Sequence, residues 1–240
     1  MQPKLLSVII PCYNEEKRIG PTLEKLLSFL KKSKMNFEII VVFDGTDRTA
    51  EVVRRFASSN KLAGKLRLLV FPKRLGKGGG LLKGFAAAKG DVMLMMDADS
   101  SVSPSEIPKL LKGLDGKDIA IGSRYMPDSN AEIQSVRRFF AFTFNSLVHL
   151  LFSLSYKDTQ CGFKAFKAHA AKKIMPLVHT MNFVWDVDVL VNANKMGFPV
   201  TEVPIEWRAA EGGSITYWNG LLIAFKMLAA LFKLRFFERE

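Results

Sequence analysis

Two carboxylates spaced two residues apart are the side chains in this sequence most suited to chemistry. Asp97-Ala98-Asp99 directly follows the apolar, strand-like run Val92–Met96. Residues i and i+2 of a strand face the same side, so both carboxylates project together where the strand ends. Open α/β folds hold their ligands at that edge of a parallel sheet. Paired carboxylates there bind Mg²⁺ or Mn²⁺ on phosphate oxygens, although most acid pairs with this spacing are solvated loop residues.

Two further loops are expected at the same edge. The first apolar run closes at Pro11, which is expected to end the strand, and Tyr13 follows with a ring that can stack on or border a nucleotide base. The second run closes at Asp44, whose carboxylate can accept hydrogen bonds from a base or ribose. The structural alternatives are a capped loop after Pro11 and an Asx turn at Asp44, with Asp47 capping the next helix.

A glycine-rich segment and three arginines supply groups that suit phosphates. Gly76–Gly80 opens a predicted helix, where glycines let backbone amides approach a phosphate and Lys77 adds positive charge. The segment is neither a P-loop nor a dinucleotide fingerprint, which disfavours a kinase or a dehydrogenase. Arg124 closes the fifth strand and Arg137-Arg138 begin a later helix, where they are placed to clamp a second phosphate or to form a solvated basic face.

The elements that must position these residues alternate along the first half of the chain. The predicted strands are Leu5–Pro11, Glu38–Phe43, Leu66–Phe71, Val92–Met96 and Ile119–Ile121. The predicted helices between them are Pro21–Leu30, Thr49–Ala57, Lys77–Ala88 and Pro104–Leu114, the last begun by a capping box at Ser103–Glu106. This alternation predicts one α/β domain with a mainly parallel sheet.

The second half is expected to contain two amphipathic helices. In Phe139–Tyr156, Asn145 and His149 fall on a polar arc opposite an apolar face, so the segment is not a membrane span. Trp218–Phe237 combines lysines with a broad aromatic and aliphatic face. It suits a helix lying in a membrane interface, and the alternative is a C-terminal helix docked on the core.

Composition limits the choice of partner. The 240 residues carry a formal net charge of +12, and the pI is about 9.7, which calls for nucleic acid, an anionic membrane surface or a phosphorylated substrate. A nucleic-acid platform would interleave aromatic and basic residues, whereas the aromatics here follow apolar helix faces, so no nucleic acid is expected. Cys12 and Cys161 form neither a disulfide framework nor a zinc spacing. Met1–Lys4 runs straight into a strand-like segment without a secretory signal, which predicts a cytoplasmic location.

Taken in order, these motifs resemble a known family. The segments are Val8–Glu15, Asp44–Thr46, Gly76–Gly79, Asp97–Asp99 and Gly122–Arg124. They are similar to the family 2, GT-A-fold inverting glycosyltransferases, whose Rossmann-like sheet is flanked by helices. The string Asp158–Lys164, with Trp185–Asp188 and Val203–Trp207, resembles the dolichyl-phosphate glucose synthases and, more loosely, the mannose synthases.

The resemblance implies roles on the donor side. The residues that match the nucleoside pocket are Pro11, Tyr13, Glu15 and Asp44. Lys77 matches a base or pyrophosphate contact, and Asp97-Ala98-Asp99 matches the donor and metal motif, with Asp97 nearer the ribose and Asp99 the firmer ligand of Mg²⁺ or Mn²⁺. The chain departs from the family at Phe43, where a second acid is usual, and at Ser101, where mannose synthases often have Gln. The second departure disfavours GDP-mannose.

On the acceptor side, Arg124 and one of the pair Arg137 and Arg138 match residues that hold a phosphate. The resemblance therefore implies transfer of a hexose from a nucleotide sugar, UDP-glucose in preference to GDP-mannose, to a polyprenyl or dolichyl monophosphate. The expected enzyme is peripheral on the cytoplasmic face of a membrane, either alone or beside a membrane-protein partner. If the acceptor is instead a hydroxyl, Asp186 or Asp188 is the candidate base, and the structural alternative is that they cap a helix.

The domain expected from these motifs is a catalytic unit over residues 1–217. Its donor half covers 1–125 and its acceptor half 126–217, and 218–240 forms the amphipathic C-terminal helix.

Overall fold

The computed structural model describes residues 2–133, 135–209 and 217–236, and it leaves the side chains of 135–137 and 217–225 undescribed. The strands are β1 (Leu6–Cys12), β2 (Phe37–Phe43), β3 (Leu66–Val70), β4 (Val92–Met95), β5 (Ile119–Ser123), β6 (Asn130–Ala131), β7 (Lys164–Lys167), β8 (Val200–Pro204) and β9 (Glu206–Trp207). The helices are α1 (Ile19–Lys32), α2 (Thr49–Ser59), α3 (Gly76–Ala87), α4 (Ile107–Gly113), α5 (Ser135–Phe152), α6 (Ala168–Ile174), α7 (Trp185–Lys195) and α8 (Tyr217–Phe236), with 3₁₀ turns at Pro104–Glu106 and Met175–Leu177.

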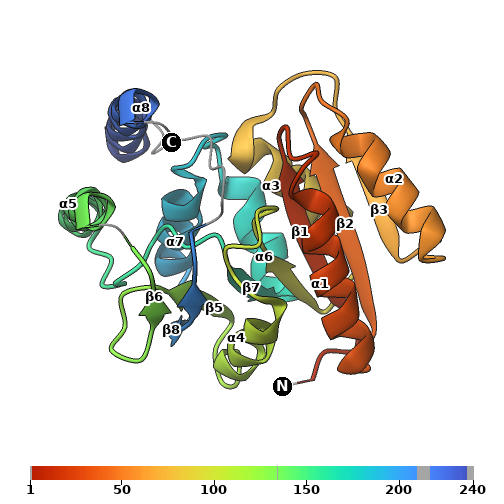
Figure 1. The fold of residues 1–240 in the computed structure, drawn as a ribbon. Helices are drawn as coiled ribbons and strands as arrows, with labels where there is room; N and C mark the ends of the chain where they lie inside the picture. Colours follow the sequence, from red (N-terminus) through yellow and green to blue (C-terminus); the bar gives the residue numbers. More distant parts are fainter. Residues whose placement is uncertain (1, 134, 210–216, 237–240) are drawn as a thin grey trace.

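Seven strands form one sheet in the order β3-β2-β1-β4-β7-β5-β8, and β7 runs antiparallel to both of its neighbours. The other neighbouring pairs are parallel. Helices α1 and α4 cover one face, and α3, α6 and α7 cover the other (Figure 1). Along β1, Val8 and Ile10 enter one core while Ile9 enters the other, which explains why strands buried on both faces read as continuous apolar runs. The predicted mixed, mainly parallel α/β fold is confirmed.

The five predicted strands and four predicted helices of the first half are present, with small shifts at their ends. Pro11 does not end β1, which continues to Cys12. The Pro11 nitrogen lies on the β4 side of β1, and pairing with β4 ends at Ile9 and Met95, so the missing N–H costs no ladder bond.

The capping box before α4 is only half formed. The Ser103 hydroxyl accepts a hydrogen bond from the Ser105 N–H at 3.3 Å, as expected of an N-cap. The Glu106 carboxylate turns away from that cap and accepts from Lys109 Nζ at 2.7 Å and from the Glu206 N–H at 3.1 Å. Glu106 therefore ties the helix to the β9 segment.

Helices α5 and α8 contact each other at one side of the domain (Figure 1). The polar arc of α5 faces protein: Asn145 and His149 bond to the Tyr156 carbonyl at 3.0 and 2.6 Å. On α8, Leu231 and Leu234 are buried in the core shared with α3, α6 and α7, so this part of the helix docks on the domain. No helix among the described residues is long and apolar enough to cross a membrane.

Candidate active site

The turn after β4 places Asp97 and Asp99 at the carboxyl edge of the sheet, as predicted. The Thr22 hydroxyl donates to the Ala98 carbonyl at 2.8 Å, and the Ser101 N–H donates to Asp99 Oδ1 at 2.9 Å. These two bonds fix the turn from both sides. The Asp97 side chain remains 39% exposed, so one face of the turn is open to a ligand.

Lys77, in the first turn of α3, reaches the same place. Its Nζ lies 3.3 Å from Asp97 Oδ1 and 3.2 Å from Asp186 Oδ2. Burial lowers the pKa of Lys77, but the two carboxylates outweigh it and the pKa is raised, so the ammonium stays charged. At Asp97, burial raises the pKa, Lys77 opposes it, and Asp99 and Asp186 add to it, so the pKa is raised overall. Lys77 is thus the cation that pairs with the Asp97 carboxylate among the described residues.

The glycines that open α3 do not leave a row of free amides for a phosphate. The Gly76 N–H donates to Asp44 Oδ2 at 2.9 Å and the Gly78 N–H donates to the Met181 carbonyl at 3.0 Å. A Cβ at Gly78 would overlap the Thr180 carbonyl oxygen. Gly76 and Gly78 are therefore needed because residues 180–185 cross directly over the start of the helix, which the phosphate-cradle expectation did not include.

The Asp44 carboxylate is bonded within the protein. Oδ2 accepts from the Leu75 and Gly76 N–H groups at 2.7 and 2.9 Å, and Oδ1 accepts from Arg74 Nη1 at 2.7 Å. The Arg74 guanidinium carbon also lies 3.3 Å from the centroid of the exposed Tyr13 ring. Arg74 therefore joins two residues of the predicted nucleoside pocket, and the sequence analysis did not name it. The feature of the sequence that could have indicated Arg74 is its position two residues before the glycine segment.

Glu15 belongs to the same edge but is not a free acid. Arg18 binds it through two hydrogen bonds of 2.6 and 2.7 Å. Burial raises the pKa of Glu15, Arg18 lowers it, and Asp99 and Asp97 raise it further, so the pKa is raised overall. The role of Glu15 in a nucleoside pocket stays a prediction.

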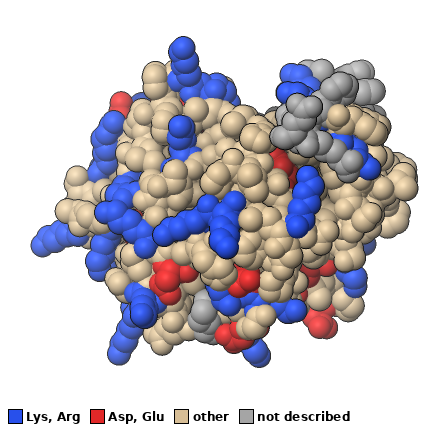
Figure 2. All heavy atoms as spheres, turned by 180° about the vertical axis from the view of Figure 1, so that it is seen from behind, with Lys and Arg blue, Asp and Glu red and all other residues tan. Residues whose placement is uncertain are grey.

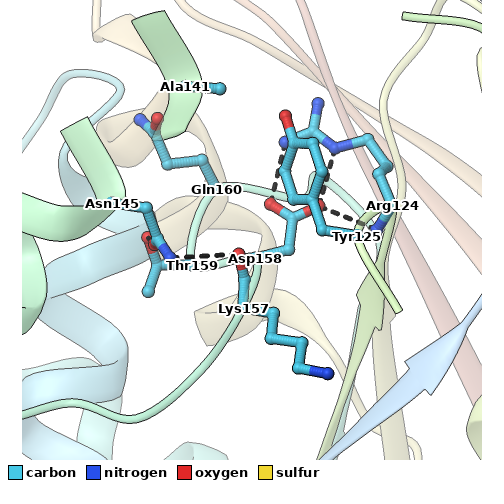
Figure 3. Close-up of a pocket in the computed structure, with 8 residues that line it drawn as sticks. All are labelled: Arg124, Tyr125, Ala141, Asn145, Lys157, Asp158, Thr159 and Gln160. Atoms are coloured by element: carbon cyan, nitrogen blue, oxygen red, sulfur yellow. Dashed lines mark hydrogen bonds and ion pairs between the residues drawn. The ribbon is translucent and has the colours of Figure 1, made fainter. Parts of the chain in front are cut away.

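Arg124 is held by a partner that the sequence analysis did not identify. Its Nε and Nη2 donate to the two oxygens of Asp158 at 2.7 and 2.8 Å, and its backbone N–H donates to Asp158 at 3.0 Å (Figure 3). Burial lowers the pKa of Arg124 but Asp158 outweighs it, and the pKa is raised. Asn145 and Gln160 line the small pocket beside this pair (Figure 3). Two of the three guanidinium nitrogens are thus committed, and Nη1 takes part in neither bond.

The structure shows no partner contact, among its described side chains, for the other two arginines of the predicted acceptor site, Arg137 and Arg138. Arg138 is exposed near the start of α5. The Arg137 side chain lies outside the described residues. No bond joins Arg138 to Arg124 in the part of the chain that the structure describes, so the predicted clamp stays a prediction.

Neither candidate base presents a free carboxylate. Asp186 is 1% exposed, and its oxygens bind Lys164 Nζ at 2.5 Å and Lys77 Nζ at 3.2 Å. Burial raises the pKa of Asp186, but the two lysines outweigh it and the pKa is lowered, which makes the group a weak base. Asp188 is also buried and accepts from the Thr180 hydroxyl at 2.9 Å and from Asn192 Nδ2 at 2.7 Å. Both acids hold the segment that covers α3.

The donor set suits a hard divalent cation. No cluster of three or more His, Cys, Asp or Glu that could hold a metal occurs among the described residues. Asp97 and Asp99 offer two carboxylates at an open turn, and Mg²⁺ is commonly held by one or two carboxylates together with substrate phosphates. The residues present therefore fit Mg²⁺ or Mn²⁺ carried on a diphosphate.

Comparison with known proteins identifies the family. Residues 7–175 match the sequence model of Glycosyl transferase family 2. The chain is 33% identical over 234 residues to dolichyl-phosphate beta-glucosyltransferase of Homo sapiens, covering 91% of this chain and 72% of that protein. It is 34% identical over 229 residues to dolichyl-phosphate beta-glucosyltransferase of Saccharomyces cerevisiae, covering 88% and 69%. The predicted resemblance to this subgroup is confirmed.

The fold is shared with solved glycosyltransferases. Glucosyl-3-phosphoglycerate synthase from Mycobacterium tuberculosis, in complex with Mn²⁺, UDP and phosphoglyceric acid, superposes with a TM-score of 0.74. The match covers 97% of this chain and 79% of that one at 18% identity, which shows a common fold. With the family match over residues 7–175 and the two relatives above 30% identity, the chain belongs to glycosyl transferase family 2.

Proposed function

We propose that this enzyme transfers glucose from UDP-glucose to the phosphate of a polyprenyl or dolichyl monophosphate, with inversion at the anomeric carbon. The observation that carries the proposal is the turn of Asp97 and Asp99 beside Lys77, at the edge of the sheet where Tyr13 also lies. The acceptor and the sugar follow the relatives, which are dolichyl-phosphate beta-glucosyltransferases. Ser101, where mannose synthases often have Gln, supports glucose over mannose.

On the donor side, the chain binds and orients a nucleoside diphosphate sugar. Asp97 and Asp99 would hold Mg²⁺ or Mn²⁺, which when bound offsets the negative charge that develops on the leaving diphosphate. Lys77 adds a partly buried positive charge at the same turn. Tyr13 offers an exposed ring to the base, and Arg74 stacks against that ring from the Asp44 side. UDP and UDP-glucose are bound by the mycobacterial neighbour, which shares the fold.

On the acceptor side, a phosphate nucleophile suits the absence of a free base among the candidates named. A phosphate monoester has a second pKa of about 6, so it is largely dianionic at neutral pH and attacks without losing a proton. Asp186 and Asp188 are buried and bonded to their own chain, which removes support for the hydroxyl-acceptor alternative. Arg124 Nη1 and Arg138 would position the phosphate and offset repulsion between two anionic substrates.

The surface of α5 and α8 supports an approach to a membrane. Large apolar side chains stand out from both helices, among them Phe142 at 72% and Leu150 at 80% exposure on α5 and Phe236 at 60% on α8. Basic residues accompany them, including Arg138 and Lys233. Lys and Arg also spread over the rear face, where acidic side chains gather mostly toward the lower edge (Figure 2). These features support the proposal that the enzyme acts at an anionic membrane surface, and the cytoplasmic side is proposed from the sequence expectation alone.

The test is transfer of labelled sugar to a defined polyprenyl phosphate in vesicles. UDP-glucose and GDP-mannose are supplied separately, each with Mn²⁺ and with EDTA, and Asp99→Asn serves as the control variant. The expected result is metal-dependent labelling of lipid from UDP-glucose alone, lost in Asp99→Asn. Labelling from GDP-mannose alone would overturn the sugar assignment, and no lipid product from either donor would overturn the acceptor.

A further inference from the structure

Four charged side chains form a row from the interior of the domain to the Asp97 turn. Lys164 Nζ lies 2.5 Å from Asp186 Oδ1, Asp186 Oδ2 lies 3.2 Å from Lys77 Nζ, and Lys77 Nζ lies 3.3 Å from Asp97 Oδ1. The members come from β7, the first turn of α7, the first turn of α3 and the end of β4. Distant parts of the chain thus converge on one alternating set of charges.

The inner end of the row is fixed. Lys164 is fully buried and also donates to the Cys161 carbonyl at 2.6 Å. Asp186 is 1% exposed and uses one oxygen for each lysine. The outer end is different, because the Lys77 ammonium is shared by two carboxylates at almost equal distances, 3.2 Å to Asp186 and 3.3 Å to Asp97. When Asp97 binds another cation, the Lys77 ammonium can therefore remain paired with Asp186.

The charges of the row sum to zero, since two lysines face two aspartates. Uncompensated charge in a protein interior is costly, so a buried set tends to keep its balance. A divalent metal alone adds two positive charges at Asp97, and a diphosphate diester alone adds two negative charges beside Lys77. Only a metal and a diphosphate bound together leave the net charge of the site at zero.

We propose that Asp186, anchored by Lys164, is a positioning residue that keeps the Lys77 ammonium beside Asp97 and remains its partner when a metal occupies Asp97. In this place Lys77 competes with a divalent metal for Asp97 until the diphosphate of the donor draws the ammonium away, which makes metal and nucleotide bind together. The inference rests on the proposed function, in which Asp97 is a metal ligand. It replaces the earlier role considered for Asp186, that of a general base.

The first test measures binding of Mn²⁺ to the full chain without nucleotide, from the loss of the free-ion signal in electron paramagnetic resonance. Lys77→Met is compared with wild type and with Lys83→Met, which removes the same charge from an exposed site on the same helix. The expected result is at least tenfold tighter Mn²⁺ binding in Lys77→Met, at least tenfold weaker binding of UDP in the presence of Mn²⁺, and no change beyond twofold in Lys83→Met. Equal or weaker Mn²⁺ binding in a folded Lys77→Met protein would overturn the proposal.

A second variant keeps the test decisive if Lys77→Met does not fold. Asp186→Asn has nearly the same shape but leaves the Lys77 ammonium on Asp97, so Mn²⁺ alone should bind at least threefold more weakly. In the Lys77→Met background the same change should alter Mn²⁺ affinity by less than twofold, because Lys164 still neutralises Asp186 there and no ammonium remains to move. Equal effects of Asp186→Asn in both backgrounds would contradict a role exerted through Lys77.

Failure of the inference and failure of the proposed function give different results. Wild-type protein that binds UDP only when Mn²⁺ is present, with variants that show no change in Mn²⁺ affinity, would refute the role of Asp186 alone. Wild-type protein that binds UDP equally well with EDTA would refute the metal-bound donor itself.

Discussion

Gly78→Ala and Gly80→Ala, two substitutions near the start of α3, are expected to change the stability of the fold in opposite directions. A Cβ at Gly80 would lie 3.5 Å from Pro11 Cβ and 3.9 Å from Val42 Cγ1, which is ordinary van der Waals contact. Alanine in a helix is favoured over glycine by about 1 kcal/mol, so Gly80→Ala should stabilise the fold by about that amount.

The same methyl group at Gly78 has no room. It would overlap the Thr180 carbonyl oxygen and lie 2.9 Å from both Cβ and Cδ1 of Trp185, which is itself fully buried. Overpacking of this kind costs about 1–3 kcal/mol, and the helical preference for alanine returns about 1 kcal/mol, so the net loss reaches about 2 kcal/mol. Because Asp186 follows Trp185 directly, the displaced segment should also weaken binding of UDP with Mn²⁺.

Thermal unfolding followed by circular dichroism measures both variants. About 1 kcal/mol corresponds to a shift of about 2–4 °C for a chain of this size, so Gly80→Ala should melt above wild type and Gly78→Ala below it. Donor binding should survive Gly80→Ala. Equal melting temperatures would refute the packing explanation of Gly78, and loss of donor binding in Gly80→Ala would favour the phosphate-cradle explanation instead.

Three other perturbations test separate parts of the structure. Arg74→Ala should weaken UDP binding with little change in the Km for the lipid, measured by calorimetry and by initial rates. Asp158→Ala leaves the Arg124 guanidinium buried without its partner and should cost about 3–5 kcal/mol in the free energy of unfolding, read from urea titration. Phe142→Ser removes an exposed ring worth about 1.5–3 kcal/mol when fully buried, so vesicle binding should fall about tenfold or more in a sedimentation assay.

The ion pairs of Asp186 with Lys164 and Lys77 should make the free energy of unfolding depend on pH in the acid range. Its pKa is lowered in the folded protein, so its contribution to stability is present above the ordinary value of 3.8 and is lost as pH falls through the folded pKa. Unfolding free energy measured from pH 5 down to pH 2 should therefore fall less steeply in Asp186→Asn than in wild type. Parallel curves would contradict the pairing with Lys164 and Lys77.

The parts of the fold that were predicted are those fixed by local pattern. Buried strands such as Val92–Met95 read as apolar runs, and the acids that end them were placed correctly at the sheet edge. Strand β7 was not predicted because Lys164–Lys167 carries a lysine at each end. Lys164 is tolerated in the interior only because Asp186 comes to it from another element, and no local pattern announces that pairing.

For the candidate site, too, some residues were predicted from the sequence and others were not. Residue types and order located Asp97 and Lys77, which pair at 3.3 Å, and Asp99 on the same turn. Partners supplied by remote segments were missed, among them Asp158 at Arg124 and the 180–185 crossing that requires Gly78. Such contacts depend on how whole elements pack, and a single sequence shows them only after the fold is known.

The central claim is that a phosphate, and not a hydroxyl, receives the sugar. The most direct measurement supplies the wild-type enzyme with UDP-glucose, Mn²⁺ and vesicles that contain either a polyprenyl phosphate or the matching polyprenol without phosphate. The account predicts a glucosylated lipid from the polyprenyl phosphate only, with β configuration if the donor linkage is α. Equal or greater transfer to the polyprenol would contradict it.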